Sequence, residues 1–145
     1  MYDDVLLPTD GSEGTTAATA HAAELAETYD ATVHVLSVAD ARNRFESPTS
    51  GIAPEAWEEE QRSQAEAAID ATVDALPDGV TVRRVLREGV PHEAVVAYVD
   101  EADVDVVVMG THGRTGLDHY LIGSVTEKVV RRSPAPVLSV RLDDD

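Results

Sequence analysis

Three glycines and a serine in the second half of the chain have a spacing that suits phosphate binding. Gly110 and Gly113 are separated by two residues, and nine residues after Gly113 the chain reads Gly123-Ser124. Backbone N–H groups must approach a phosphate closely, and a Cβ atom would obstruct that approach. A helix that begins near Ser124 would add free N–H groups and the positive end of its dipole. The pattern therefore predicts an anion site that uses backbone atoms.

Ser124 has a second interpretation, because Ser124 and Glu127 have the spacing of a capping box. Taken alone, the serine would only cap a helix, and the glycines are what favour a ligand. Charge favours the same region: residues 110–132 carry a local balance of +2, whereas the other residues carry −19. Arg114 lies inside the glycine loop, while Arg131 and Arg132 also suit the C-terminal end of the helix.

The elements that must position this loop alternate between β-branched runs and Ala/Glu-rich stretches. Residues 104–109 are nearly all Val, which is typical of a strand buried on both faces in a parallel sheet. Ser12 can cap the first helix, and Pro54 and Pro91 each open a later one. We predict strands over residues 5–7, 32–38, 81–86, 104–109 and 136–140, and helices over 12–29, 54–76, from 91 onward and over 124–132.

Five strands separated by four helices predict one α/β domain over residues 1–145, an open parallel sheet with helices on both faces. Ligands of such sheets bind beyond the carboxyl ends of strands, where the strand order reverses. The loops after the first and fourth predicted strands, residues 9–14 and 110–124, are rich in Gly, Asp, Ser and Thr. Residues 39–54 are the least patterned segment, which we interpret as a mobile loop, and residues 143–145 are an acidic tail.

The composition is strongly acidic, with 28 Asp and Glu against 11 Lys and Arg, and a formal charge of −17. Self-repulsion of this size opposes a compact fold at low ionic strength, but at molar salt the Debye length is only about 3 Å. We interpret the surface as halophilic. Free nucleic acid is excluded as a partner, because binding it requires basic side chains. With no cysteine, membrane span or targeting segment, we expect a cytoplasmic protein.

The pattern Gly110-x2-Gly113-x9-Gly123-Ser124 resembles the ATP-binding signature of the universal stress protein family. Residues 5–12 (VLLPTDGS) look like the family's first strand and turn, residues 90–93 (VPHE) like its third-helix entry, and residues 133–138 (SPAPVL) like its closing strand. The resemblance covers essentially the whole chain. It implies an adenine-nucleotide-binding, Rossmann-like fold with strand order 3-2-1-4-5, in which the first and fourth strands lie side by side.

The resemblance also implies roles for single residues. Pro8 and Asp10 would lie against the nucleoside, with Asp10 reaching ribose hydroxyls or a phosphate-bound metal. Val38 would meet adenine through its backbone, and Met109 and Gly110 would border the ribose. The residues expected around the phosphates are Thr111, His112, Gly113, Arg114, Thr115, Gly116, Gly123, Ser124, Val125 and Thr126.

Other chemical motifs are missing from the sequence. Asp10-Gly11-Ser12 resembles half of a phosphatase motif, but the nucleophilic Asp would fall on Pro8. No P-loop, nucleophile elbow or His-Glu-x-x-His occurs, so we expect no metal held by protein ligands alone. A Mg²⁺ ion that arrives with ATP, near Asp10, is favoured instead, because Mg²⁺ prefers phosphates plus one or two carboxylates.

We therefore expect an ATP-binding regulatory protein of the stress-response type with slow or no hydrolysis, since no dedicated general base stands out. Two alternatives stay open. One is a slow ATPase that uses Asp10, His112 and Arg114. The other is a dimeric interaction module that does not depend on nucleotide. The resemblance implies a homodimer through the edge strand over residues 136–140, and an unknown protein partner is compatible with either alternative.

Overall fold

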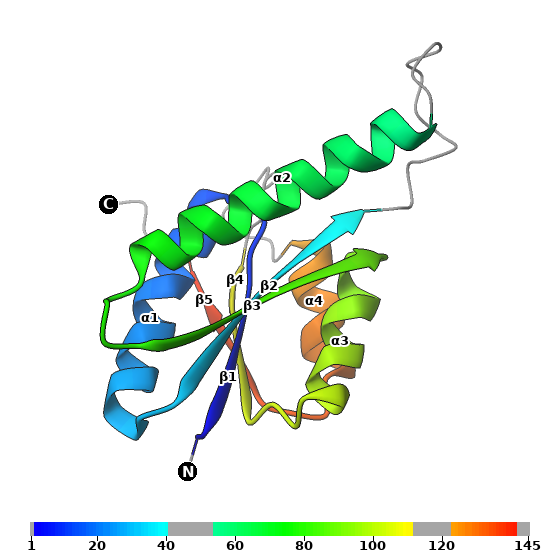
Figure 1. Cartoon of the computed structure of the whole chain (residues 1–145). Coiled ribbons are helices and arrows are strands. Elements are labelled where there is room, and N and C mark those ends of the chain that lie inside the picture. The colour runs from blue at the N-terminus through cyan, green and yellow to red at the C-terminus, as the bar shows by residue number, and fades with distance from the viewer. Residues whose placement is uncertain (1, 41–53, 112–122, 142–145) are drawn as a thin grey trace.

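The computed structural model describes residues 2–40, 54–111 and 123–141 (Figure 1). Strands and helices alternate along this part of the chain, as the sequence predicts. The elements are β1 (Asp4–Pro8), α1 (Glu13–Tyr29), β2 (Thr32–Asp40), α2 (Pro54–Ala75), β3 (Thr81–Gly89), α3 (Pro91–Glu101), β4 (Val106–Gly110), α4 (Ser124–Arg132) and β5 (Val137–Val140).

The strands form one parallel sheet in the order β3-β2-β1-β4-β5, which confirms the predicted topology. The chain builds outward from β1 through β2 to β3 and then crosses to the other side for β4. The direction of winding therefore reverses between β1 and β4, and this is where an open α/β sheet offers room for a ligand.

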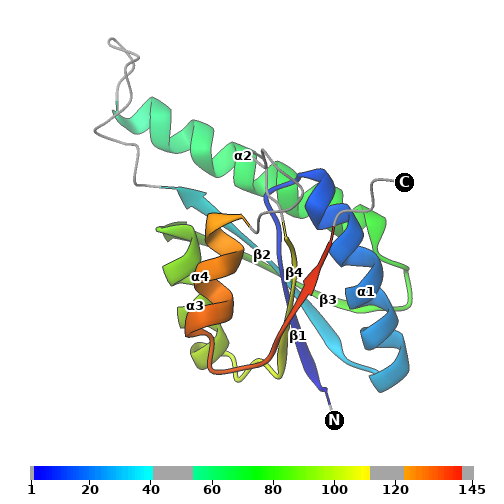
Figure 2. The same cartoon turned by 180° about the vertical axis from the view of Figure 1, so that it is seen from behind.

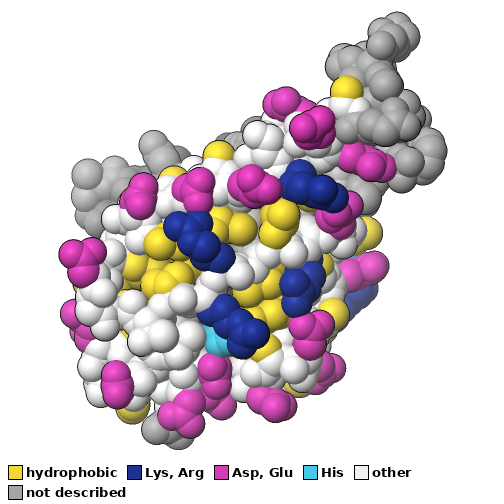
Figure 3. Space-filling model, viewed as in Figure 1, with side chains coloured by type: hydrophobic (Ala, Val, Ile, Leu, Met, Phe, Trp, Pro, Cys, Tyr) yellow, Lys and Arg dark blue, Asp and Glu magenta, His cyan; other side chains and the backbone are white. Residues whose placement is uncertain are grey.

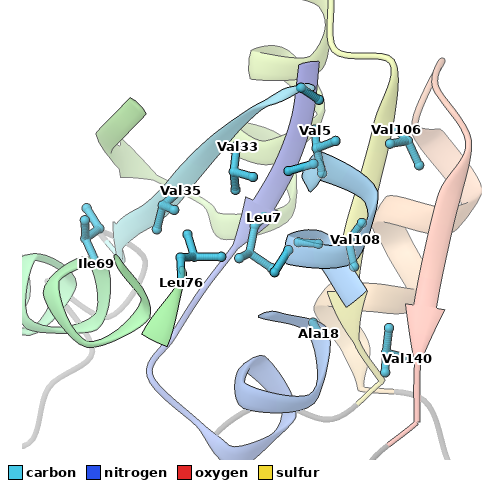
Figure 4. Close-up of a cluster of buried hydrophobic side chains, with 14 residues drawn as sticks. Val5, Leu7, Ala18, Val33, Val35, Ile69, Leu76, Val106, Val108 and Val140 are labelled. Carbon is cyan, nitrogen blue, oxygen red and sulfur yellow. The ribbon is translucent and has the colours of Figure 1, made fainter. Parts of the chain in front are cut away.

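Two helices cover each face of the sheet. Figures 1 and 2 show α1 and α2 on one face and α3 and α4 on the other. Because successive strand residues point to opposite faces, Val5 and Leu7 pack toward α1 and α2 (Figure 4), whereas Leu6 packs toward α3 and α4. Val107 and Val108 are both fully buried, as expected for a central strand covered on both faces.

The element boundaries differ modestly from the predicted ones. β2 continues through Asp40 and β3 through Gly89, so both strands are longer than their β-branched cores suggested. β4 begins at Val106, because Val104 lies in the turn after α3 and donates its N–H to the Val99 carbonyl. Of the predicted mobile loop, residues 39–40 belong to β2 and residue 54 to α2. Residues 41–53 and the acidic tail lie outside the described residues.

None of the helices in the described residues is long and apolar enough to cross a membrane.

Candidate functional site

The register of the sheet places several predicted site residues at one level. Pro8 pairs with Leu36 and Leu6 with Val107. Continuing these registers past the strand ends brings Asp10 level with Val38, and Thr9 level with Gly110. The carboxyl ends of β2, β1 and β4 therefore form one edge, and the candidate residues from three separate parts of the sequence lie along it.

Asp10 is held in a tight turn between β1 and α1. Its Oδ1 accepts a hydrogen bond from the Ser12 backbone N–H at 2.9 Å and another from the Thr15 hydroxyl at 3.3 Å. This Asx-type turn passes through Gly11, whose φ of +79° lies in the left-handed region that favours glycine. The carboxylate thus lies at the positive end of α1, where a negative charge is stabilised.

Ser12 occupies the N-cap position of α1, but its side chain does not cap the helix, contrary to the sequence-based expectation. The Asp10 carboxylate accepts a hydrogen bond from the Ser12 N–H, and the Ser12 carbonyl accepts hydrogen bonds from the N–H groups of Thr15 and Thr16. The Ser12 hydroxyl itself is buried and has no hydrogen-bond partner within the described part of the chain. Burying a hydroxyl without a hydrogen-bond partner is unfavourable.

Gly110, the last residue of β4, lies directly against the start of α1. A Cβ atom on Gly110 would come within 2.5 Å of the Gly14 carbonyl oxygen and within 2.9 Å of the Gly14 Cα. Glycine is therefore required at position 110 by contact with helix backbone, a reason that the phosphate pattern did not supply. The contact brings the loops after β1 and β4 together at the point where winding reverses.

The first turn of α4 is also tied to the end of β4. The Thr126 hydroxyl donates to the Gly110 carbonyl at 2.7 Å, and the Gly123 N–H donates to the Thr111 carbonyl at 2.6 Å. The Thr111 N–H in turn bonds the Val140 carbonyl at the end of β5. Gly110 and Thr111 thereby fix where α4 begins, although eleven residues separate Thr111 from Gly123 in sequence.

The capping-box interpretation of Ser124 is wrong. Gly123 is the N-cap residue of α4, and its carbonyl accepts the Glu127 N–H. Ser124 is the first helical residue and is exposed. The N–H groups of Ser124, Val125 and Thr126 belong to the first turn, which has no intrahelical acceptors. Backbone donors, an exposed hydroxyl and the positive helix end therefore coincide, which suits an anion.

The remaining predicted residues divide into three groups. Met109 is buried in the core toward α3 and α4, and Val38 and Val125 pack against that same core with half-buried side chains. Pro8 ends β1 and is half-buried. The predicted residues His112, Gly113, Arg114, Thr115 and Gly116 lie outside the described residues.

Arg131 and Arg132, two of the basic residues in the predicted positive region, lie at the C-terminal end of α4, and Arg114 lies outside the described residues. Arg131 forms an ion pair with Glu127, and Arg132 Nη1 lies 3.2 Å from His92 Nε2. Both arginines are in the last turn of α4, about 10 Å from its N-terminus at 1.5 Å per residue. They therefore serve the C-terminal end of the helix, as the alternative interpretation held, and contribute little at Ser124.

Sequence reasoning missed a set of buried hydroxyl groups beneath the site. Thr9, Ser37 and Thr72 are all buried, and each is hydrogen-bonded to another member of the set. One signal was available: Thr72 interrupts the apolar row of α2 that includes Ile69 and Leu76. The described residues contain no group of three or more His, Asp or Glu side chains that could hold a metal ion.

The fold and the candidate site together define a class: an open α/β protein in which two helix N-termini meet where the winding reverses, between β1 and β4. The model of the universal stress protein family matches residues 1–141. The chain belongs to this family.

Individual relatives agree over nearly the full length. Universal stress protein MJ0531 of Methanocaldococcus jannaschii is 34% identical over 146 residues, covering 97% of this chain and 83% of the relative. The solved structure of protein MJ0577 superposes with a TM-score of 0.83 at 31% identity, covering 100% of this chain and 99% of that one. A solved universal stress protein in complex with cAMP has a TM-score of 0.63 at 25% identity, covering 98% of each chain.

Proposed function

We propose that this chain binds ATP, with Mg²⁺ carried by the phosphates, at the edge formed by the ends of β1, β2 and β4. The observation that carries the proposal is the convergence of two helix N-termini on Gly110. α1 reaches Gly110 through Gly14, and α4 through the Thr126 hydroxyl. The relative solved with cAMP supports an adenine nucleotide as the ligand class.

The two helix N-termini differ in charge and in the hydrogen-bond donors that they present. We use this difference to assign the phosphates and the sugar to different ends. The N-terminus of α1 already faces the Asp10 carboxylate, which would repel a bare phosphate. The N-terminus of α4 presents backbone donors and the exposed Ser124 hydroxyl. We therefore assign the phosphates to Ser124, Val125 and Thr126, and the ribose hydroxyls or the phosphate-bound Mg²⁺ to Asp10.

We propose that the nucleoside lies at the same level of the sheet. Val38 at the end of β2 would meet adenine through its backbone, and Pro8, Met109 and Gly110 would border the sugar. Thr111 and Gly123 hold the two sides of the phosphate region together through their backbone hydrogen bond. His112, Gly113, Arg114, Thr115 and Gly116 complete the proposed phosphate region in the sequence.

We propose a regulatory role in the stress response for the bound state, with slow or no hydrolysis. Hydrolysis requires a group that positions water, and the Asp10 Oδ1 is engaged with the Ser12 N–H and the Thr15 hydroxyl. This arrangement supports a carboxylate that shapes the turn and contacts ligand. A turnover clearly above the buffer rate and abolished by Asp10→Ala would instead support the slow ATPase.

The test is titration calorimetry of Mg²⁺-ATP in multimolar KCl with the wild type and Ser124→Asp. The added carboxylate suits a helix N-terminus and leaves α4 stable, but it opposes the phosphates at contact distance. We expect saturable binding by the wild type and a loss of at least about tenfold in affinity in the variant, equivalent to about 1.4 kcal/mol.

Thr28→Asp is the matched control, because it adds the same charge to an exposed position in the last turn of α1. Thr28 is about 20 Å along the helix from Gly14, and in molar salt charges act over only about 3 Å. The control should bind ATP as the wild type does. Absence of binding by the folded wild type would contradict the proposal and favour the interaction module.

We also propose that the chain forms a homodimer through β5. The strand pairs with β4 on one side, and its other side is an edge of the sheet. Leu138 on β5 and Val130 on α4 are two of the three large apolar side chains that the described residues expose, at 40% and 49%. An edge strand flanked by exposed apolar side chains is suited to pairing with a second copy.

A further inference from the structure

The loop that carries Asp10 is supported from α2 as well as from the sheet. The Thr72 hydroxyl on α2 donates to the Thr9 Oγ1 at 2.8 Å. Both residues are buried, with 4% of Thr72 and 7% of Thr9 exposed. They are 63 positions apart in sequence, so this bond joins a helix to the strand-end loop that directly precedes the proposed nucleotide contact.

Ala68, one helical turn away on the same face of α2, lies near Gly11. A Cβ atom placed on Gly11 would be 3.5 Å from the Ala68 Cβ and 3.7 Å from the Ala68 Cα, which is ordinary van der Waals contact. Ala68 and Thr72 are four residues apart and therefore share one face of the helix. Figures 1 and 2 both show α2 passing beside the start of α1. This helix face thus contacts the loop at Thr9 and lies opposite Gly11, with room for no more than about one side-chain atom between Gly11 and Ala68.

Thr9 links α2 to the segment that carries Asp10. Its Oγ1 accepts the Gly11 N–H at 3.1 Å, so the Thr9 and Thr72 hydroxyls and the Gly11 backbone form one hydrogen-bonded chain. The Thr9 carbonyl accepts the Ser37 hydroxyl at 2.8 Å, and its N–H donates to the Leu36 carbonyl at 2.8 Å. Thr9 is therefore fixed by β2 on one side and by α2 on the other, with Asp10 as the next residue.

The residue type at position 72 points to the same role. Position 72 lies in the apolar row of α2 with Ile69 and Leu76, where valine would fill a similar volume without a polar group to satisfy. A buried hydroxyl is unfavourable unless it is hydrogen-bonded. The Thr72 hydroxyl meets this requirement through its hydrogen bond to the Thr9 Oγ1, the same atom that accepts the Gly11 N–H.

We propose that Thr72, with Ala68, is a positioning residue for the nucleotide site: from α2 it sets the conformation of residues 9–11 and hence the place of the Asp10 carboxylate. The inference rests on the proposed function for its effect on ligand binding. Its structural part, the control of the Gly11 amide by a helix that contributes no proposed ligand contact, stands independently.

The test compares Thr72→Val, which removes the hydroxyl and keeps the shape, with Thr72→Ser, which keeps the hydroxyl. Thr19→Val is the matched control. Thr19 is also a buried threonine with 4% exposed, but its hydroxyl donates to the Thr15 carbonyl within α1. Each variant is examined in multimolar KCl by Mg²⁺-ATP calorimetry, by chemical denaturation and by NMR hydrogen exchange of the Gly11 amide.

We expect Thr72→Val to weaken ATP binding by roughly fivefold or more, the fold-change that the loss of one buried hydrogen bond produces. Gly11 amide exchange should accelerate in the same variant, Thr72→Ser should restore both, and Thr19→Val should change neither even if it lowers stability equally. If Thr72→Val does not fold, Thr72→Ala removes the same hydroxyl with a better helix former.

The outcomes separate this inference from the proposed function. Unchanged ATP affinity and unchanged Gly11 exchange in a folded Thr72→Val overturn the positioning role. Equal losses in Thr72→Val and Thr19→Val also overturn it, because they would show a general stability effect. If the wild type does not bind ATP, the proposed function fails, and Gly11 exchange alone then decides whether Thr72 controls the loop.

Discussion

At the scale of single residues, the side chain that accepts a backbone N–H at the start of α1 is not that of the N-cap residue. Asp10, two residues before the N-cap, accepts the Ser12 N–H, whereas the Ser12 hydroxyl is buried without a partner among the described residues. A serine at an N-cap ordinarily contributes about 1 kcal/mol through its side chain. Here the carboxylate of Asp10 shapes the turn instead, which links helix formation to the proposed ligand contact.

Ser12→Ala should therefore change the free energy of unfolding by less than about 0.5 kcal/mol, in place of the usual loss of about 1 kcal/mol. Removing a buried hydroxyl without a partner also removes its desolvation cost, so a small gain in stability is the favoured sign. Chemical denaturation in multimolar KCl measures the difference. A loss of 1 kcal/mol or more would show that the hydroxyl caps the helix in solution.

A second prediction at this scale concerns Tyr98, which lies away from the site. Its hydroxyl is 2.7 Å from His34 Nδ1, and His34 Nε2 is 2.8 Å from Asp4 Oδ1. Burial raises the pKa of Tyr98 above its usual 10.0, and the Coulombic effects of Arg83 and Arg87 oppose that shift. Below pH 10 the phenol is neutral in the folded and unfolded states alike. Above it, the unfolded chain loses this proton more readily.

The free energy of unfolding should therefore fall as the pH rises above 10, and Tyr98→Phe should lessen that fall. Denaturation at pH 9 and at pH 11 measures both slopes. Tyr29→Phe is the control, since Tyr29 is 39% exposed. Identical pH dependence in the wild type and Tyr98→Phe would contradict the role of the buried phenol.

At the scale of the elements, Gly110 joins β4, α1 and α4. Gly110→Ala would press a Cβ atom against the Gly14 backbone at 2.5 Å, and a helix backbone cannot yield as the end of a side chain can. We expect a loss of about 1–3 kcal/mol in unfolding free energy, the usual range for overpacking. Chemical denaturation provides the measurement.

Gly79→Ala is the matched control for this contact. A Cβ atom on Gly79 would meet nothing within 4 Å, and the backbone there is not in the left-handed region. The control should be neutral or more stable by about 0.4–1 kcal/mol, because alanine restricts the unfolded chain. Equal effects of the two substitutions would show that the contact between β4 and α1 does not require glycine.

The order of the elements could be predicted from the sequence, because each strand and helix carries its own periodicity and the breakers Pro54, Pro77 and Pro91 separate them. The ends of the strands could not be predicted, because β2 and β3 are extended by pairing with each other. Ala39 pairs with Glu88, and Asp40 pairs with Gly89. That stabilisation comes from a neighbour about fifty residues away in sequence and leaves no local signal.

The candidate site shows the same limit. The spacing of the glycines and the acidic turn at Asp10 indicate the edge of the sheet, and the resemblance suggests the ligand that we propose. The capping of α4 by Gly123 depends on the Thr111 carbonyl, and the support of Thr9 depends on Thr72. Both are tertiary hydrogen bonds between distant segments, so residue types and spacing alone could not specify them.

At the scale of the whole molecule, the main feature is the net negative charge. Figure 3 shows basic side chains set among acidic ones on the face that carries β3. Arg62 pairs with Glu88, Arg84 with Asp70 and Arg87 with Glu101, and all of these side chains are at least 41% exposed. Exposed pairs contribute only about 0–1 kcal/mol each. Charged side chains on the edge strand β3 discourage another chain from pairing with it. These ion pairs cannot, however, offset a net charge of −17.

Transfer from multimolar KCl to low salt should therefore loosen or unfold the protein. Removing salt strengthens the few ion pairs, yet it strengthens repulsion among 28 acidic side chains more. Circular dichroism and denaturation at both salt concentrations test this expectation. Unchanged spectra and unchanged unfolding free energy would contradict the halophilic interpretation of the composition.

The assembly proposed through β5 gives the last prediction. Leu138→Glu places a charge on the exposed apolar side of the edge strand, where a second copy would bring the same charge opposite it. The variant should be monomeric at concentrations where the wild type is dimeric, as sedimentation equilibrium in multimolar KCl measures. Tyr29→Glu, at an equally exposed apolar residue near the end of α1, should leave the dimer intact.

Because β5 is joined to the proposed ligand edge by the hydrogen bond from the Thr111 N–H to the Val140 carbonyl, ATP titrations of the Leu138→Glu monomer also show whether the nucleotide site is complete within one chain. A wild type that is monomeric throughout would remove the dimer proposal while leaving the site at Gly110 untouched.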